Sequence, residues 1–280
     1  MRDLSNDTSL LAINGATVRQ RWTLPEIIDG CARYGIGGIS PWRDQIEAYG
    51  LANAARQIRE AGLVVNGICR GGMFPTSNAA AHKAMLDENR RAIDEAGELQ
   101  ARCLVMIAGG LPEGSKDLAD AHKQVADSIS ELVDDARAAG VRLAIEPLHP
   151  MYAADRACVN TLKHALDICD HLGDDQVGVA IDVYHVWWDP ELEDQIARAG
   201  RRGRIFGFHV CDWLVPTKDF LLDRGMMGDG VIDIPKIRGW VEKTGFDGMC
   251  EVEIFSAENW WKKDPDLVLR TCIERHKTVV

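Results

Sequence analysis

Short apolar runs alternate with longer amphipathic segments along this chain, and the alternation occurs eight times. The runs lie at residues 10–16, 35–40, 63–70, 103–109, 141–147, 177–183, 204–210 and 249–255. They are apolar almost throughout, which is typical of β-strands that are covered on both faces. The segments between them, such as 117–140 and 157–173, carry apolar residues at helical spacing. Several end in Gly, which ends a helix readily because it accepts positive φ.

Eight strand–helix units without a linker or low-complexity insert predict the α/β class. Specifically, they predict one (β/α)8 TIM barrel domain over residues 1–280. A doubly wound open sheet is the alternative. Such a sheet usually carries a Gly-x-Gly-x-x-Gly turn after its first strand, and LAINGATVRQR lacks that turn. The barrel is therefore favoured.

Each of the last four apolar runs carries, one or two residues before its end, a side chain that can bind a cation. These side chains are Glu146, Asp182, His209 and Glu253. In a TIM barrel the active site lies at the carboxyl ends of the strands, so the four are expected to converge. Taken singly, each has a structural interpretation as an ion pair, a turn cap or a core histidine. Together they favour a metal site, because a buried carboxylate is costly unless it is paired or metal-bound.

Three carboxylates and one imidazole suit a hard or borderline divalent cation such as Mn²⁺, Mg²⁺ or Co²⁺, and Zn²⁺ is possible by ligand type. The chain has no His-Glu-x-x-His pattern, so a zinc-peptidase site is not supported. An octahedral ion with four protein ligands keeps two positions for adjacent oxygens of a sugar or keto-sugar. Glu251 alternates with Glu253 and is expected on the same face of the last strand.

Charge and composition exclude several partners. The net charge of −11 argues against a nucleic acid, since phosphate backbones attract basic surfaces. No apolar stretch reaches the roughly 20 residues that span a bilayer, and the start MRDLSND is polar. Eight scattered cysteines without a Cys-x-x-Cys pair indicate buried thiols in a reducing compartment. We expect a soluble cytoplasmic protein.

The motifs EPLHP, AIDVYH, GFHVCD and GFDGMCEVEIF resemble those of the xylose-isomerase-like TIM barrel superfamily. The resemblance covers most of the chain and is sharpest from about residue 141 to 256. More narrowly, the chain resembles the sugar phosphate isomerase/epimerase group, with its ketose 3-epimerases and inosose dehydratases. The superfamily also contains 3-oxo-glycoside lyases.

The resemblance implies that Glu146, Asp182, His209 and Glu253 bind one divalent metal, often Mn²⁺. It implies that the two glutamates act as acid/base groups on opposite faces of the sugar. It also implies substrate contacts for His185 and Arg224, and a homo-oligomer, either a dimer or a tetramer.

Three further residues are candidates by their place at the expected barrel mouth. Trp42 follows the second apolar run and Arg70 ends the third, so both are predicted to contact substrate. His149 lies three residues after Glu146, where an imidazole would be an additional catalytic base.

We therefore expect a divalent-metal-dependent isomerase or epimerase of a small keto-sugar or cyclitol. Glu146 and Glu253 would move a proton next to a carbonyl through a metal-stabilised enediolate. One alternative is a metal-dependent lyase or dehydratase acting on an inosose or a 3-oxo-glycoside, which His149 favours. Less favoured alternatives are an endonuclease-type phosphodiesterase and a non-catalytic sugar-binding barrel.

Overall fold

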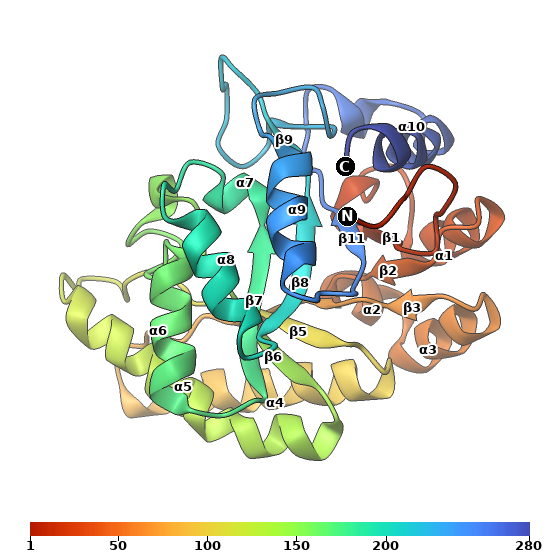
Figure 1. Ribbon diagram of the computed structural model, residues 1–280. Helices are drawn as coiled ribbons and strands as arrows, with labels where there is room; N and C mark the ends of the chain where they lie inside the picture. Colours follow the sequence, from red (N-terminus) through yellow and green to blue (C-terminus); the bar gives the residue numbers. More distant parts are fainter.

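A ring of parallel strands surrounded by helices forms the protein (Figure 1), and the computed structural model describes all of residues 1–280. The ring contains nine strands in the order β3-β2-β1-β11-β8-β7-β6-β5-β4. They are β1 (Leu11–Asn14), β2 (Gly38–Ser40), β3 (Val64–Val65), β4 (Ile68–Gly72), β5 (Cys103–Ile107), β6 (Arg142–Glu146), β7 (Val177–Asp182), β8 (Ile205–Val210) and β11 (Cys250–Val252).

The ninth strand arises because the third apolar run divides in two. Its first part, β3, pairs with β2, and its second part, β4, pairs with β5. Residues 66 and 67 interrupt the run between them, and Trp42 forms a parallel bridge to Cys69. The divided run thus joins the two edges of the sheet. The fold is the expected TIM barrel, with one strand broken.

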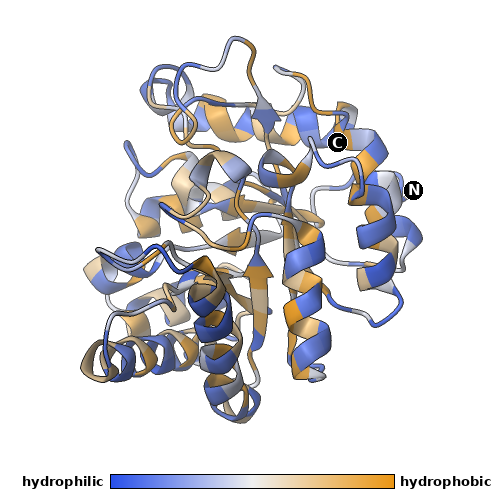
Figure 2. Ribbon diagram, turned by 90° about the vertical axis from the view of Figure 1, so that its left-hand side faces the viewer, coloured by the Kyte–Doolittle hydropathy of each residue, from blue (hydrophilic) through white to orange (hydrophobic).

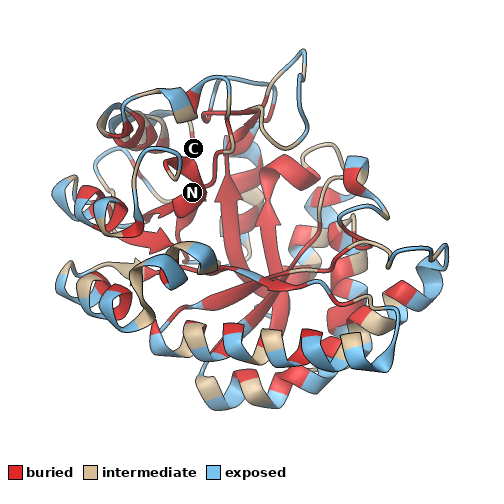
Figure 3. Cartoon of the chain, turned by 180° about the vertical axis from the view of Figure 1, so that it is seen from behind, coloured by how far each residue is buried: buried red, intermediate tan, exposed pale blue.

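Helices cover the outside of the barrel. They are α1 (Leu24–Arg33), α2 (Arg43–Tyr49), α3 (Leu51–Glu60), α4 (Ala79–Glu98), α5 (Leu118–Ala139), α6 (Leu162–Leu172), α7 (Val183–Val186), α8 (Leu192–Gly200), α9 (Ile234–Lys243) and α10 (Pro265–Thr278). The outer helices have distinct hydrophobic and hydrophilic sides (Figure 2), and the strands they cover are buried (Figure 3). None of these helices is both long and apolar enough to cross a membrane. All eight cysteines are buried and free, as expected.

The helix predicted over 157–173 begins later than expected, at Leu162. The Thr161 side chain accepts a hydrogen bond from the backbone N–H of His164 at 3.1 Å and so caps the helix there. The preceding residues are extended, and the Cys158 N–H donates to the Gly109 carbonyl at 2.8 Å. The strand-like contact with Gly109 therefore keeps the residues before Leu162 out of the helix, despite their helical pattern.

A loop excursion, residues 211–233, follows β8 and returns the chain to the barrel mouth. It contains the antiparallel pair β9 (Asp212–Trp213) and β10 (Arg224–Gly225). The Asp212 carboxylate accepts hydrogen bonds from the backbone N–H groups of Trp213, Gly228 and Ile232 at 2.9 to 3.0 Å. The Tyr152 and Tyr184 hydroxyls both donate to the Phe220 carbonyl. These contacts fix the excursion over the mouth and carry Arg224 into it.

The two ends of the chain lie beside each other, near the buried His276 of α10. The Arg238 guanidinium donates to the carbonyls of both Arg2 and Val280. His276 is fully buried, and neither of its ring nitrogens has a hydrogen-bond partner. Burial lowers the pKa of His276 to about 4, and the charge of Arg238 acts in the same direction.

Because of His276, we expect the protein to lose stability in mild acid. The unfolded chain binds a proton at this residue near pH 6.5, whereas the folded protein does so only near pH 4. Stability should fall as the pH drops from about 6.5 to 4, by at most about 3 kcal/mol from this residue. Urea unfolding at pH 7 and pH 4.5 should show a smaller loss for His276→Leu than for the wild type. Equal losses would contradict this explanation.

Candidate metal centre

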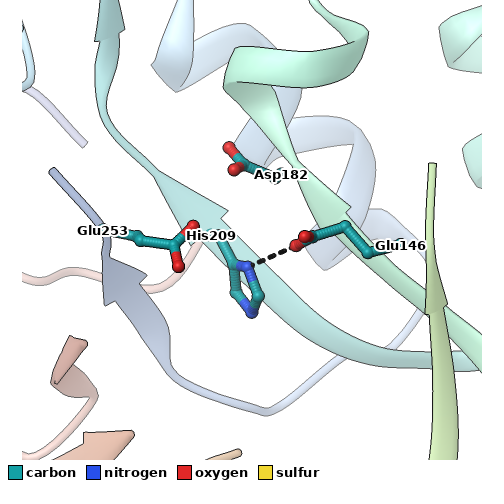
Figure 4. Close-up of side chains that lie close together, drawn as sticks. All are labelled: Glu146, Asp182, His209 and Glu253. Carbon is teal, nitrogen blue, oxygen red and sulfur yellow. Dashed lines mark ion pairs between the residues drawn. The ribbon is translucent and has the colours of Figure 1, made fainter. Parts of the chain in front are cut away.

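Glu146, Asp182, His209 and Glu253 converge at the carboxyl end of the barrel. One potential ligand atom from each lies within 4.8 Å of the other three, and all four side chains are buried. They come from β6, β7, β8 and the residue after β11, which are consecutive neighbours in the sheet. Figure 4 shows the three carboxylates arranged around the His209 ring. The four side chains that the sequence places near strand ends therefore form one cluster.

Two atoms of the cluster lack any hydrogen-bond partner. Glu146 Oε1 and His209 Nδ1 lie 2.8 Å apart (Figure 4), but they are not aligned for a hydrogen bond. Both atoms are shielded from solvent. Buried polar atoms without partners are rare in folded proteins and call for an explanation such as an ion. The donor set and these two atoms fit a divalent cation held by all four side chains.

Burial and crowding set the pKa values of the carboxylates. Burial, together with the negative charges of Glu146 and Asp182, raises the pKa of Glu253 to about 8 against the opposing effect of Arg224. Burial likewise raises the pKa of Glu146. Burial also acts to raise the pKa of Asp182, but the charge of Arg224 holds it below its usual value. Negative charge is thus concentrated here without water to stabilise it, and a cation would relieve it.

Arg224 supplies positive charge inside the cluster. Its Nη1 lies 2.9 Å from Asp182 Oδ2 and 3.1 Å from Glu253 Oε2. The guanidinium also lies over the rings of Tyr184 and Phe255, at 4.4 and 5.1 Å from their centroids. The structure therefore brings this predicted substrate-contacting residue into direct contact with two of the predicted ligands.

His185 lies in the same pocket as a neutral ring. Donors face both of its ring nitrogens: the backbone N–H of His149 lies 3.1 Å from Nδ1, and Arg224 Nη2 lies 3.2 Å from Nε2. Burial lowers the pKa of His185 to about 3, partly offset by the charge of Asp182. The Nε2 atom lies 3.7 Å from Asp182 Oδ2. These two donors hold the ring in place on the wall of the cavity.

The His149 side chain packs away from the cluster. Its ring stacks on Trp213 with centroids 4.7 Å apart and makes an edge contact with Trp188 at 5.9 Å. Its Nδ1 accepts from the Met151 N–H at 3.2 Å, and burial lowers its pKa to about 4. The ring does not line the cavity at the metal centre. In this structure His149 acts on the site through its backbone, which holds His185.

His149→Ala tests the predicted role of this residue as a base. We expect turnover to fall by less than the roughly 100-fold or more that general acid–base groups contribute, because the ring does not reach the cavity. Steady-state kinetics of the metal-loaded variant would measure the effect. A loss of several hundredfold in kcat with an unchanged KM would instead support catalysis by the imidazole.

A cavity of about 220 Å³ opens above the cluster. Of the predicted site residues it is lined by Glu146, Glu253, His185, Arg224, Trp42 and Arg70. The sequence reasoning missed several others, namely Met73, Tyr152, Asp155, Arg156, Leu221 and Phe255. A second pocket of about 520 Å³ shares Trp42, Cys69, Arg70 and Met73 with this cavity. The two spaces therefore adjoin at the mouth of the barrel.

Comparison with known proteins agrees with this geometry. The family model of the xylose isomerase-like TIM barrel matches residues 28–272, and the chain belongs to that family. A curated relative, the inosose isomerase of Bacillus velezensis, is 24% identical over 286 residues, which cover 96% of each chain.

Two solved structures extend the comparison. Protein SMc04130 from Sinorhizobium meliloti 1021 is 58% identical, with a TM-score of 0.96 over 98% of this chain and 99% of that one. The IOLI protein, solved with a bound zinc atom, is 22% identical, with a TM-score of 0.82 over 96% and 97% of the two chains. Other matches are an epimerase of a 3-keto-D-glucoside and one of D-psicose. These two structures agree with the chain in fold, and the curated isomerases place it in the class of isomerase enzymes.

Proposed function

We propose that the protein is a divalent-metal-dependent isomerase or epimerase of a small keto-sugar or cyclitol. The observation that carries this proposal is the buried cluster of three carboxylates and one imidazole at the base of a cavity of about 220 Å³. Relatives named inosose isomerase support a cyclitol-like substrate. The zinc atom in the IOLI structure supports a bound divalent metal.

Glu146, Asp182, His209 and Glu253 would hold the cation. The donor set suits Mn²⁺, Mg²⁺ or Co²⁺ and admits Zn²⁺, and the family resemblance makes Mn²⁺ the first ion to test. A bound divalent cation supplies positive charge that polarises a substrate carbonyl and stabilises the negative charge of an enediolate.

The two glutamates are placed to exchange a proton with the substrate. Glu146 ends β6 and Glu253 follows β11, and they lie on either side of His209 (Figure 4). One removes the proton next to the carbonyl and the other returns a proton. Burial raises the pKa values of both carboxyls, that of Glu253 to about 8.

Other residues of the cavity would bind and orient the sugar. His185 and Arg224 both line the cavity, and Arg224 offers N–H groups to a substrate oxygen beside the two carboxylates. Trp42 and Arg70 lie further out, where the cavity meets the second pocket. These contacts would hold the reacting carbon near the glutamates and exclude water from it.

The proposal is tested by product analysis in D₂O. The Mn²⁺-loaded protein would be incubated with ketohexoses, inososes and 3-oxo-glucosides, and the products examined by NMR and mass spectrometry. We expect a new isomer that carries deuterium at the carbon next to the carbonyl. Loss of water or of an aglycone would replace the proposal with a lyase reaction. Absence of deuterium exchange in every substrate, while the metal is bound, would contradict proton transfer at this site.

A further inference from the structure

A fifth carboxylate lies directly beneath the metal centre, inside the barrel. Glu251 is fully buried in β11, and its register places it beside His209 of β8 on the same face of the sheet. It is not among the four residues of the cluster. Barrel interiors are normally filled by apolar side chains. A charged side chain at this depth therefore calls for a specific reason.

Three hydrogen bonds hold the Glu251 carboxylate in place. The Asn14 amide donates to Oε1 at 2.7 Å, and the Ser40 hydroxyl and the Asn66 amide donate to Oε2 at 2.5 and 2.7 Å. All three donors are themselves buried. Hydrogen bonds of this kind offset the cost of burying a carboxylate. The interior of the barrel therefore contains a preformed site for a carboxylate.

The fixed charge faces the side of His209 that points away from the cluster. Glu251 Oε2 lies 3.7 Å from His209 Nε2, while His209 Nδ1 points to Glu146. A metal-bound histidine commonly presents its second ring N–H to a carboxylate, which fixes the tautomer and the ring orientation. We propose that Glu251 is a positioning residue that keeps the proton of His209 on Nε2 and so leaves Nδ1 free to bind the metal.

The same hydrogen bonds connect this carboxylate to the substrate cavity. Asn14 Oδ1 accepts a hydrogen bond at 2.7 Å from the indole N–H of Trp42, which lines the cavity. Asn14 is oriented by this bond so that its amide N–H₂ points to Glu251. Trp42, Asn14 and Glu251 are therefore linked by hydrogen bonds, and Glu251 lies 3.7 Å from His209 of the metal centre. The inference rests on the proposed metal site but not on the identity of the sugar.

Metal affinity provides the test, because it requires no substrate. Dissociation constants for Mn²⁺ and Co²⁺ would be measured by competition with a chelator for the wild type and Glu251→Gln. The variant keeps all four ligands and the size of the side chain but loses the charge. We expect binding to weaken by about 10- to 100-fold, the usual effect of removing such a partner. Ser40→Ala, which removes one donor and leaves the charge, should weaken binding by much less than tenfold.

A second measurement uses the wild type and does not depend on the variant folding. In the Zn²⁺-loaded protein, ¹⁵N NMR should show His209 with metal on Nδ1 and a slowly exchanging proton on Nε2. Metal on Nε2 would overturn the inference. So would a Glu251→Gln variant that binds metal as tightly as the wild type and only unfolds more easily, since that result indicates a purely structural role. A wild-type protein that binds no divalent metal would instead overturn the proposed function.

Discussion

Glu253→Gln should lower turnover by at least about 100-fold, the low end of what a general acid or base contributes. Glutamine keeps the size of the side chain but neither takes up a proton nor carries the negative charge that binds a cation. The variant should therefore also bind Mn²⁺ more weakly than the wild type. Both effects follow from the position of Glu253, which is buried, close to the other three ligands and part of the cavity wall. Steady-state kinetics at saturating metal would distinguish the loss of proton transfer from the loss of metal binding.

Glu258→Gln is a suitable control for this experiment. Glu258 lies five residues further along the chain on the surface, where it pairs with Lys262. Its replacement should leave activity and metal binding unchanged. A fully active Glu253→Gln variant would remove Glu253 from both proposed roles.

Arg224→Met should destabilise the metal-free protein strongly. The guanidinium is the cation that contacts both Asp182 and Glu253 in this structure, and all three groups are buried. Removing one partner from a buried ion pair leaves an unpaired charge and typically costs about 3–5 kcal/mol. Urea unfolding in EDTA would measure the loss. Arg270→Met, at an exposed arginine without an ion pair, should change stability by no more than about 0.5 kcal/mol.

Added metal should restore part of the stability lost in Arg224→Met. A divalent cation bound by the same carboxylates replaces the missing positive charge, and binding to the folded state alone raises its stability. The gain on adding Mn²⁺ should be measurable in both proteins and should persist without Arg224. If the Arg224→Met protein were as stable in EDTA as the wild type, the contacts of Arg224 with Asp182 and Glu253 would contribute nothing to the stability of the metal-free protein.

Much of the fold was predictable because the strand pattern is local. The eight apolar runs correspond to the eight strand positions, and the ends of the last four gave the cluster of Glu146, Asp182, His209 and Glu253. The break in the third run was not predictable from its apolar character. It depends on β3 and β4 pairing with different neighbours, which is a property of barrel closure.

The positions of the residues around the cluster were not predictable from the sequence, because contacts between distant segments determine them. The direction of the His149 ring is set by stacking on Trp213, which lies in the excursion after β8. The hydrogen bonds to Glu251 come from Asn14, Ser40 and Asn66, and each of these looks like an ordinary polar residue in its own segment. Of the cavity residues, Tyr152 lies in a single 3₁₀ turn and Leu221 in a loop, where no periodic pattern marks them.

Anomalous diffraction from crystals grown with Mn²⁺ tests the central claim most directly. The account predicts one strong peak per chain between Glu146, Asp182, His209 and Glu253, with one atom of each within about 2.0–2.6 Å of the ion. His209 should bind through Nδ1, with Nε2 facing Glu251. A peak elsewhere in the protein, or none at this cluster at saturating Mn²⁺, would contradict the account.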